Sequence, residues 1–327
     1  MRKSWLLGFL LIAQVSSVQA ESLTLAASPF TTYVDDEGEP ARLSQIIREA
    51  FSRMDQDLQL NVMRQAFLGS SLLSGRADGE FAYLDLGDRK SNFVYSKPYL
   101  PAYLYAASKA QSVQRVKLIP HLHDYRVAIE NRFANTPRFR LIKDIKWSRN
   151  PSSFDVFRQI ADDRAPYLIT TRLLIDEFNR LLSRDGEELL LLSAAPLVST
   201  GLHLSLNKKH ADAQTVITRF DETIATMQRD GSFNRLLGIA WLTRDVDGDG
   251  VADYISSSDV AHEVKDADAL NYTYPLDATQ TGDASSFYVD GKKYDDWQDV
   301  APLIADSGSI RPSLLDPEVY ARMIQRW

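Results

Sequence analysis

The stretch ARLSQIIREAFSRM, residues 41–54, lies between two short apolar runs, LTLAA at 23–27 and LQLNVM at 58–63. Its apolar residues recur three and four positions apart, which is the spacing of an amphipathic helix: Leu43, Ile46, Ile47, Ala50 and Phe51. The flanking runs have the length and the apolar content of strands. A strand, a helix and a strand joined by short connections predict a parallel sheet covered by helices, and so an α/β fold.

The same alternation continues along the chain and then repeats. A helix at 68–74, stopped by Gly75, and a strand at 81–86 complete the first unit. In the second unit we expect strands at 125–130, 140–145 and 167–170, and helices at 152–161 and 173–182. A strand at 202–206 and a helix at 211–229 follow. The sequence therefore predicts two α/β units of similar size in tandem.

The first twenty residues have the pattern of a secretory signal peptide. Arg2 and Lys3 precede an almost wholly apolar run from Trp5 to Val15, and Val18-Gln19-Ala20 offers a small-x-small cleavage site. The apolar run is shorter than the roughly 20 residues that a membrane span needs, although an N-terminal anchor is the alternative. We expect residues 1–20 to be removed and the protein to be periplasmic. The chain has no Cys, which excludes disulfides, thiolate metal sites and a lipid-anchored form.

Charge is unevenly distributed. Residues 243–327 hold 17 Asp and Glu against 7 Lys and Arg, whereas residues 21–242 are close to neutral. A near-neutral body argues against nucleic acid as a partner, because nucleic acid selects a basic stripe. From Thr243 to Ser286, Asp, Gly, Ser and Thr dominate, and a small folded piece is expected from Phe287 to Ile304. The acidic last quarter suggests a solvated surface or a cation site.

Within this acidic region, DVDGDGVAD at residues 245–253 has the spacing of a calcium loop. Asp245, Asp247, Asp249 and Asp253 occupy positions 1, 3, 5 and 9, Gly250 provides the sharp turn, and the Val251 carbonyl would be the ligand at position 7. Position 12 of the loop, which covers 245–256, is Ser256 instead of the usual bidentate Glu. We expect Ca²⁺ there, in a structural role, and no organic cofactor. An acidic hairpin turn is the alternative.

Four motifs in a fixed order resemble the family 3 extracellular solute-binding proteins, the receptors of polar amino acid ABC transporters. The motifs cover about residues 23–242. They are Pro29-Phe30 with Tyr33, Asp36 and Gly38; Leu72 with Gly75, Ala77 and Asp78; Asp88-Arg89-Lys90 with Val94-Tyr95-Ser96-Lys97-Pro98-Tyr99; and Met227-Gln228-Arg229-Asp230-Gly231-Ser232-Phe233.

The resemblance implies a two-lobed type II periplasmic binding fold followed by a small acidic C-terminal extension, residues 243–327. Residues 21–242 would form the solute-binding domain. Lobe 1 would comprise 21–106 and 197–242, and lobe 2 would comprise 107–196. Two strands would cross between them, near 103–107 and 194–198, and a ligand would lie in the cleft and be enclosed by hinge closure.

The resemblance also implies which residues contact the ligand. Arg89 matches the arginine that holds the ligand carboxylate, because a guanidinium can donate two parallel hydrogen bonds; an ion pair with Asp85 or Asp88 is its alternative. Phe30 and Tyr33 match aromatic residues of the opening loop, or they serve lobe packing. Asp85 stands where the family has a hydroxyl, and Thr171 stands where the family has an Asp for the ligand amino group.

Losing that ammonium partner argues against an ordinary α-amino acid, since an unpaired buried charge costs several kcal/mol. The turn at 130–136 also replaces the family's carboxylate-binding turn, and it carries Arg132. Together with Arg138 and Arg172, Arg132 favours an anionic or carboxylate-bearing ligand, although surface placement is the alternative.

These patterns predict a monomeric receptor, not an enzyme, that captures a small molecule for a membrane transporter or a sensor. One alternative is a signalling or interaction module in which a calcium-ordered tail docks to a partner. Another is an enzyme on the same fold, similar to a dehydratase. No nucleophile elbow and no phosphate loop are present in the sequence.

Overall fold

The computed structural model describes residues 22–35, 41–264, 270, 273–304 and 310–327. The expected signal peptide, residues 1–20, lies outside these ranges, as do Asp36 and Gly38 of the opening loop. Among the described residues, none of the helices combines the length and the apolar character needed to cross a bilayer.

Lobe 1 is built on a strand that is parallel to both of its neighbours. Strand β1 (Leu23–Ala27) lies between β2 (Leu58–Val62) and β3 (Gly79–Leu84). The helices of this lobe are α1 (Arg42–Arg53), α2 (Gln65–Ser74), α7 (Ala213–Arg229) and α8 (Ser232–Leu237). The apolar stripe of α1 is fully buried, as its spacing predicts. Lobe 1 therefore has the predicted strand–helix–strand core.

Two long antiparallel strands connect the lobes. They are β5 (Leu100–Ser108) and β10 (Val198–Asn207). Strand β10 also pairs with β3 of lobe 1, whereas β5 also pairs with β8 (Tyr167–Thr171) of lobe 2. The result is one continuous sheet in the order β2-β1-β3-β10-β5-β8-β6-β7, to which the short strands β4 (Phe93–Tyr95) and β9 (Leu191–Leu192) are attached.

Lobe 2 repeats the parallel arrangement of lobe 1. Strand β6 (Arg126–Glu130) lies between β7 (Lys146–Asn150) and β8, parallel to both. The two main helices are α5 (Ser153–Ala161) and α6 (Arg172–Arg184). The shorter ones are η1 (Gln111–Arg115), η2 (Ile119–Leu122), α3 (Asn131–Ala134) and α4 (Pro137–Arg140). Ser152 caps α5, since its hydroxyl accepts the backbone N–H of Asp155 at 3.1 Å.

One expected strand of lobe 2 is wrong. Residues 140–145 do not form a strand: Pro137–Arg140 is the helix α4, and the strand begins only at Lys146. Pro137 occupies the first turn of α4, where its fixed φ favours a helix and its missing N–H costs nothing. Leu141, which suggested a buried strand, is 80 % exposed. The apolar alternation there is therefore not a core pattern.

The acidic extension forms a second, smaller sheet in the order β13-β11-β12-β14-β15. Its elements are β11 (Leu242–Arg244), β12 (Asp253–Ser256), α9 (Ser258–Ala261), β13 (Tyr274–Pro275), β14 (Phe287–Val289), β15 (Lys292–Tyr294) and α10 (Trp297–Ile304). The indole of Trp241 packs against Phe287 and Trp297, with ring centroids 5.9 Å apart in both pairs. This sheet therefore has a core of its own.

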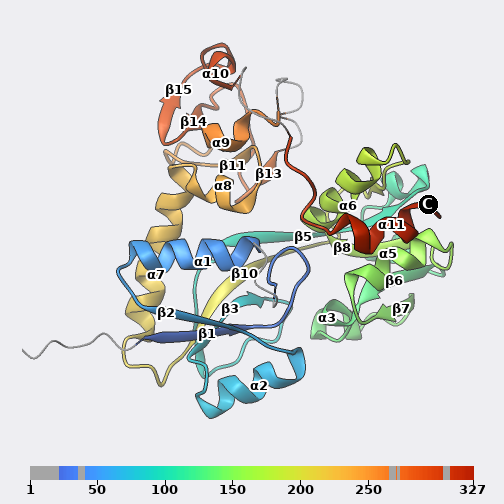
Figure 1. Cartoon of the computed structure of the whole chain (residues 1–327), viewed down its shortest axis with the longest axis horizontal. Coiled ribbons are helices and arrows are strands. Elements are labelled where there is room, and N and C mark those ends of the chain that lie inside the picture. The colour runs from blue at the N-terminus through green and yellow to red at the C-terminus, as the bar shows by residue number, and fades with distance from the viewer. Residues whose placement is uncertain (1–21, 36–40, 265–269, 271–272, 305–309) are drawn as a thin grey trace, which may run out of the picture.

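The chain then leaves the small sheet and ends on the other lobe. Helix α11 (Pro317–Ile324) lies against α5 and α6 of lobe 2, far from the small sheet, which sits beside α8 of lobe 1 (Figure 1). The two-lobed α/β class with two crossing strands and a small C-terminal extension is thereby confirmed. The boundaries we expect at 106 and 197 fall near the end of β5 and just before β10.

Candidate ligand cleft between the lobes

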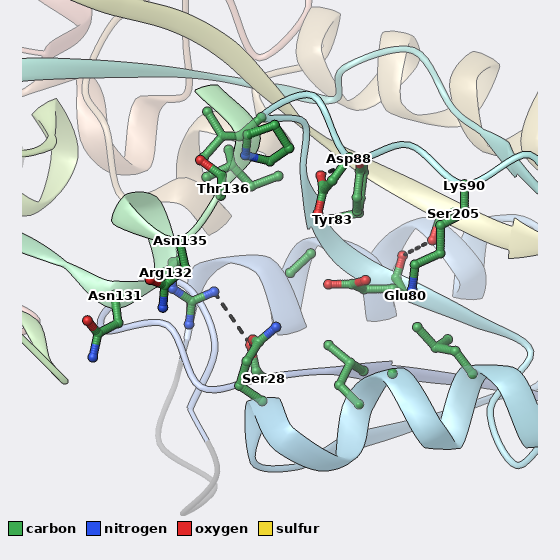
Figure 2. Close-up of a pocket in the computed structure, with 18 of the residues that line it drawn as sticks. Ser28, Glu80, Tyr83, Asp88, Lys90, Asn131, Arg132, Asn135, Thr136 and Ser205 are labelled. Atoms are coloured by element: carbon green, nitrogen blue, oxygen red, sulfur yellow. Dashed lines mark hydrogen bonds between the residues drawn. The ribbon is translucent and has the colours of Figure 1, made fainter. Parts of the chain in front are cut away.

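A cavity of about 650 Å³ lies between the two lobes. Helix α2 and strands β3 and β4 supply its lobe 1 wall, and the short helices α3 and α4 supply its lobe 2 wall (Figure 2). Its polar lining comes from both sides: Ser28, Glu80, Tyr83, Asp88 and Lys90 of lobe 1, and Asn131, Arg132, Asn135, Thr136 and Arg140 of lobe 2. A cavity of this volume suits a small metabolite.

Glu80 is the most unusual group in this cavity. It lies on β3, in the otherwise apolar run GEFAYL, and its side chain points into the cavity (Figure 2). Burial raises its pKa to about 7, against the attraction of Arg132 and Lys90. No described side chain hydrogen-bonds to its carboxylate. Glu80 is therefore a polar group positioned to bind a donor inside the cleft.

Arg132 crosses the cleft from lobe 2. Its guanidinium lies 4.3 Å from the ring centroid of Phe30 and donates hydrogen bonds to the Pro29 carbonyl and, at 3.5 Å, to the Ser28 hydroxyl. Burial lowers its pKa, although Glu130 and Glu80 oppose this. Its Nε is buried 4.0 Å from a Glu130 oxygen, and no described group accepts a hydrogen bond from it. Arg132 thus closes one part of the cleft by direct contacts between the lobes.

The expected aromatic residues lie where the two lobes meet and contact one another, but they are not among the described residues that line the cavity. Phe30 and Tyr33 stack with ring centroids 4.3 Å apart, and both are fully buried. The Tyr33 hydroxyl donates to Thr171 Oγ1 of lobe 2 at 3.0 Å, and burial raises the pKa of Tyr33 to about 12. Phe30, Tyr33, Thr171 and Arg132 are thus brought together, as interlobe packing. Whether they also contact a ligand stays a prediction.

Arg89 and Asp85 lie apart from this group. Arg89 Nε is 2.6 Å from Asp85 Oδ2, which is the ion pair considered as the alternative for Arg89. Its terminal nitrogen is 3.2 Å from Nε2 of His203, whose Nδ1 lies 2.7 Å from the Ser96 carbonyl. The Nδ1 therefore carries the proton, and Nε2 accepts from Arg89. Neither Arg89 nor Asp85 is among the described residues that line the cavity. A ligand contact by Arg89 stays a prediction.

Sequence reasoning missed Glu80, Lys90 and Thr136 as cleft residues. A signal existed for Glu80, because one acidic residue interrupts an otherwise apolar, buried strand. Lys90 lies within the family motif, but the resemblance assigns the ligand contact to its neighbour Arg89. Thr136 lies in a turn whose local sequence has no distinctive pattern. Which residues of such a turn face the cleft depends on how the lobes meet.

The calcium-type loop forms the tip of the β11–β12 hairpin. Carboxylate oxygens of Asp245, Asp247 and Asp253 lie within 4.8 Å of one another. Asp245 accepts the backbone N–H groups of Gly248 and Gly250, at 2.6 and 3.0 Å. Among the described acids, Asp249 lies outside this group and accepts the N–H of Val251 at 2.8 Å.

Two features bear on the electrostatics of this loop. Burial raises the pKa of Asp253, which is 3 % exposed, and the charge of Asp247 adds to the rise. The Nζ of Lys293 lies 3.3 Å from Asp247 and supplies one positive charge. Three clustered carboxylates beside one Lys leave an excess of negative charge that a cation would balance.

No family model matches this chain, and no curated protein sequence matches it either. Solved structures do match, and they define the class: the two lobes and crossing strands are the fold of the periplasmic amino-acid binding proteins. A mutant of ArgBP from T. maritima aligns with a TM-score of 0.52 and 18 % identity, over 65 % of this chain and 93 % of that one. The GluR0 ligand-binding core in complex with L-glutamate aligns with a TM-score of 0.55 and 7 % identity, over 67 % and 97 %.

The periplasmic VFT2 domain of Bordetella pertussis BvgS is a third similar structure, with a TM-score of 0.52 and 15 % identity over 66 % of this chain and 92 % of that one. A histidine kinase sensor domain aligns at the same identity. At such identities the similarity shows the fold alone. Each of these alignments leaves about one third of this chain uncovered.

Proposed function

We propose that this protein captures a small molecule between its two lobes, on behalf of a membrane transporter or a sensor. The observation that supports this most directly is the interlobe cavity, whose polar lining comes from both lobes and includes the Glu80 carboxylate, to which no described side chain donates a hydrogen bond. A ligand that contacts both walls stabilises the closed arrangement, which is how such a fold couples binding to a change of shape.

The ligand is a small molecule that carries a carboxylate or another anionic group. Lys90, Arg132 and Arg140 supply positive charge to the cavity wall, and a guanidinium can hold an oxyanion through two parallel hydrogen bonds. Glu80 adds a preference that the sequence did not predict. The Glu80 carboxylate favours a hydrogen-bond donor or a cationic group on the same ligand. A ligand with both kinds of group satisfies both walls at once.

A cavity-filling variant tests this proposal directly. Gly69 lies on α2 and lines the cavity, and a Cβ added there meets nothing within 4 Å. We expect Gly69→Phe to fill the cavity while the chain still folds. Ser70→Phe is the matched control, because Ser70 is the exposed neighbour on the same helix.

The readout is the thermal shift produced by a library of small carboxylates, amino acids and other zwitterions, with native mass spectrometry of the protein purified from its own host. Retention of a small molecule by the parent chain and by Ser70→Phe, but not by Gly69→Phe, supports the proposal. No retained molecule and no shift across the library would contradict it.

A signalling module is the second candidate, and one observation favours it. Phe30, Tyr33, Arg132 and Thr171 join the lobes by direct contacts within the protein, and a transport receptor must break such contacts to open and exchange its cargo. Deleting the chromosomal copy and measuring uptake of the molecule retained by the protein separates the two candidates. A loss of uptake supports transport, and unchanged uptake with altered gene expression supports sensing.

Two further parts of the proposal concern the ends of the chain. We propose that residues 1–20 direct export to the periplasm, where the mature protein is a monomer, and that the loop 245–256 holds a structural Ca²⁺. The clustered carboxylates of Asp245, Asp247 and Asp253 support the ion. N-terminal sequencing of the protein recovered from a periplasmic fraction tests export, because cleavage predicts Glu21 as the first residue.

A further inference from the structure

The last described residues, 310–327, contact both lobes, and we name them the latch segment. They run from the small sheet beside lobe 1 to α11 on lobe 2 (Figure 1). Leu315, Tyr320, Met323 and Ile324 join the buried core of α5 and α6. The ring of Trp327 packs against Phe178 with centroids 5.2 Å apart, and its Nε1 donates to the Glu188 carbonyl at 2.7 Å. Helix α11 is therefore an integral part of the surface of lobe 2.

The other end of the extension is fixed to lobe 1 and to the crossing strand β5. Asn234 of α8 donates from its side-chain amide to the carbonyl of Ile255 in the small sheet, at 2.8 Å. The hydroxyl of Tyr274 donates to the Pro101 carbonyl of β5 at 2.7 Å, and that of Tyr103 on β5 donates to the Pro275 carbonyl at 3.0 Å. The extension thus spans the hinge, with its two ends on different lobes.

Arg311 joins the lobes by its own side chain. Its Nε donates to the Gly238 carbonyl of lobe 1 at 2.9 Å, while its two terminal nitrogens donate to the two carboxylate oxygens of Glu177 on α6, at 3.1 and 2.5 Å. The backbone N–H of Leu314 donates to Glu177 as well, at 2.7 Å. Glu177 is 1 % exposed, so these contacts are shielded from water.

Glu177 and Ser153, both of lobe 2, each form a direct contact with lobe 1. Glu177 accepts from Arg42 of α1, which is itself 2 % exposed. Ser153 of α5 donates to Thr31 Oγ1 of lobe 1 at 2.6 Å, and the adjacent Phe154 packs against the Tyr320 ring of α11, with ring centroids 5.3 Å apart. A side chain of the latch segment therefore lies beside each of these interlobe contacts.

Separating the lobes would have to break this network. A hinge motion that moves α6 away from α1 leaves Arg42 without its carboxylate, and it pulls Arg311 from either Gly238 or Glu177. Breaking a buried ion pair is costly because the remaining charge stays desolvated. Opening becomes cheaper once Arg311 and α11 have left lobe 2, because water then reaches Glu177.

We propose that residues 310–327 latch the two lobes in the closed arrangement, and that undocking of this segment from lobe 2 is the step that opens the cleft. The inference rests on the proposed function only in treating the cleft as the ligand site. It assigns the regulation of that site to the C-terminal extension.

The distance between the lobes tests the latch without any ligand. Because the chain has no Cys, Ser70→Cys on α2 and Arg138→Cys on α4 give one spin label on each lobe at exposed positions. Pulsed dipolar spectroscopy then measures the distance distribution for the full chain and for Arg311→Ala. We expect a second population at longer distance in the variant, with the open-to-closed ratio raised about a hundredfold, as for the loss of one partner of a buried charge network.

Matched variants keep the outcome decisive. Arg184→Ala removes an exposed Arg of α6 that pairs only with Asp185 among the described residues, and it must retain the parent distribution. Arg311→Lys keeps the charge but cannot reach Gly238 and both oxygens of Glu177 together, so it decides the question if Arg311→Ala does not fold. Parent-like distances in the folded Arg311 variant, or a parent chain that is already mostly open, overturn the latch. Failure to bind any ligand would instead count against the proposed function and leaves this distance test intact.

Discussion

Arg311 and Glu177 form a two-pronged ion pair between the C-terminal extension and lobe 2, with nitrogen–oxygen distances of 3.1 and 2.5 Å. The residues are 134 positions apart in sequence. Because Arg42 of lobe 1 shares the same carboxylate, one buried Glu holds three parts of the molecule together. This is the feature on which the mechanical behaviour of the cleft depends.

Replacing Glu177 with Gln should strongly destabilise the protein. The change leaves Arg42 and Arg311 buried without a countercharge, which typically costs about 3–5 kcal/mol. Urea unfolding followed by circular dichroism measures the change in the free energy of unfolding. Glu222→Gln is the control, because Glu222 is an exposed residue of α7 whose carboxylate has no described partner, and it should stay within about 0.5 kcal/mol of the parent.

The same residue should make the protein sensitive to strong acid. The arginines and the Leu314 N–H oppose the effect of burial and hold the pKa of Glu177 at about 2, below its ordinary value of 4.5. The folded state therefore favours the ionised form, and its stabilisation is complete above pH 4.5 and is lost as the pH falls towards 2. Over this range the stability difference between the parent and Glu177→Gln should shrink by about 3 kcal/mol. An unchanged difference between pH 6 and pH 2.5 would contradict this account.

Glu80 should show the opposite dependence on pH. Its folded-state pKa of about 7 lies above the ordinary 4.5, so its effect favours the folded state below pH 4.5 and is lost as the pH rises through 7. Glu80→Gln removes the ionisable group. The variant should gain about 1–3 kcal/mol over the parent at pH 8 compared with pH 4.5. Unfolding curves measure the difference in unfolding free energy between variant and parent at each pH. An equal difference at the two pH values would show that Glu80 is not desolvated.

Calcium should stabilise the extension through its acidic loop. Asp245→Asn removes a carboxylate that both shapes the loop and lies in the cluster of three, so calcium should raise the melting temperature of the parent but not of the variant. Asp283→Asn, at an exposed acid outside the cluster, should respond as the parent does. Equal melting temperatures of the parent with calcium and with chelator would rule out the ion.

Gly231 should tolerate no side chain. Its φ is +80°, and a Cβ there would lie 2.4 Å from the carbonyl oxygen of Ser256, where the small sheet meets lobe 1. Gly186 has a similar φ of +73° but nothing within 4 Å. Gly186→Ala should cost about 1 kcal/mol from backbone strain alone, whereas Gly231→Ala should cost about 2–4 kcal/mol because the overpacking adds to it. Equal losses of unfolding free energy would mean that the contact with Ser256 relaxes freely.

Much of the fold follows from local pattern. The stripe of α1, the stop of α2 at Gly75 and the cap of α5 at Ser152 each depend on neighbours a few residues away, so the sequence predicts them well. The expected strand at 140–145 does not form. Its apolar alternation is a property of the local sequence, whereas the burial of its side chains depends on tertiary packing. Leu141 faces solvent for reasons that only the packing of α4 decides.

The candidate site is less accessible to sequence. Phe30 and Tyr33 could be named from the resemblance, and Arg132 from the turn that departs from it; the three side chains lie together where the lobes meet. Their partners could not be named, because Thr171 and Pro29 reach them only after two lobes have closed. Glu80 interrupts an apolar strand, which is a signal in the sequence, but its position in the cavity depends on how the two lobes meet.

The alternation of strands and helices, the absence of disulfides and the acidic loop follow from composition and from contacts over a few residues, so they can be predicted from the sequence. Three features become visible only in the folded chain: Arg89 pairs with Asp85 beside the cleft, Glu80 faces the cavity, and Arg311 reaches Glu177 across 134 positions. Burial and ion pairing depend on which distant surfaces come together, and the free energy of a charge depends on that enclosure.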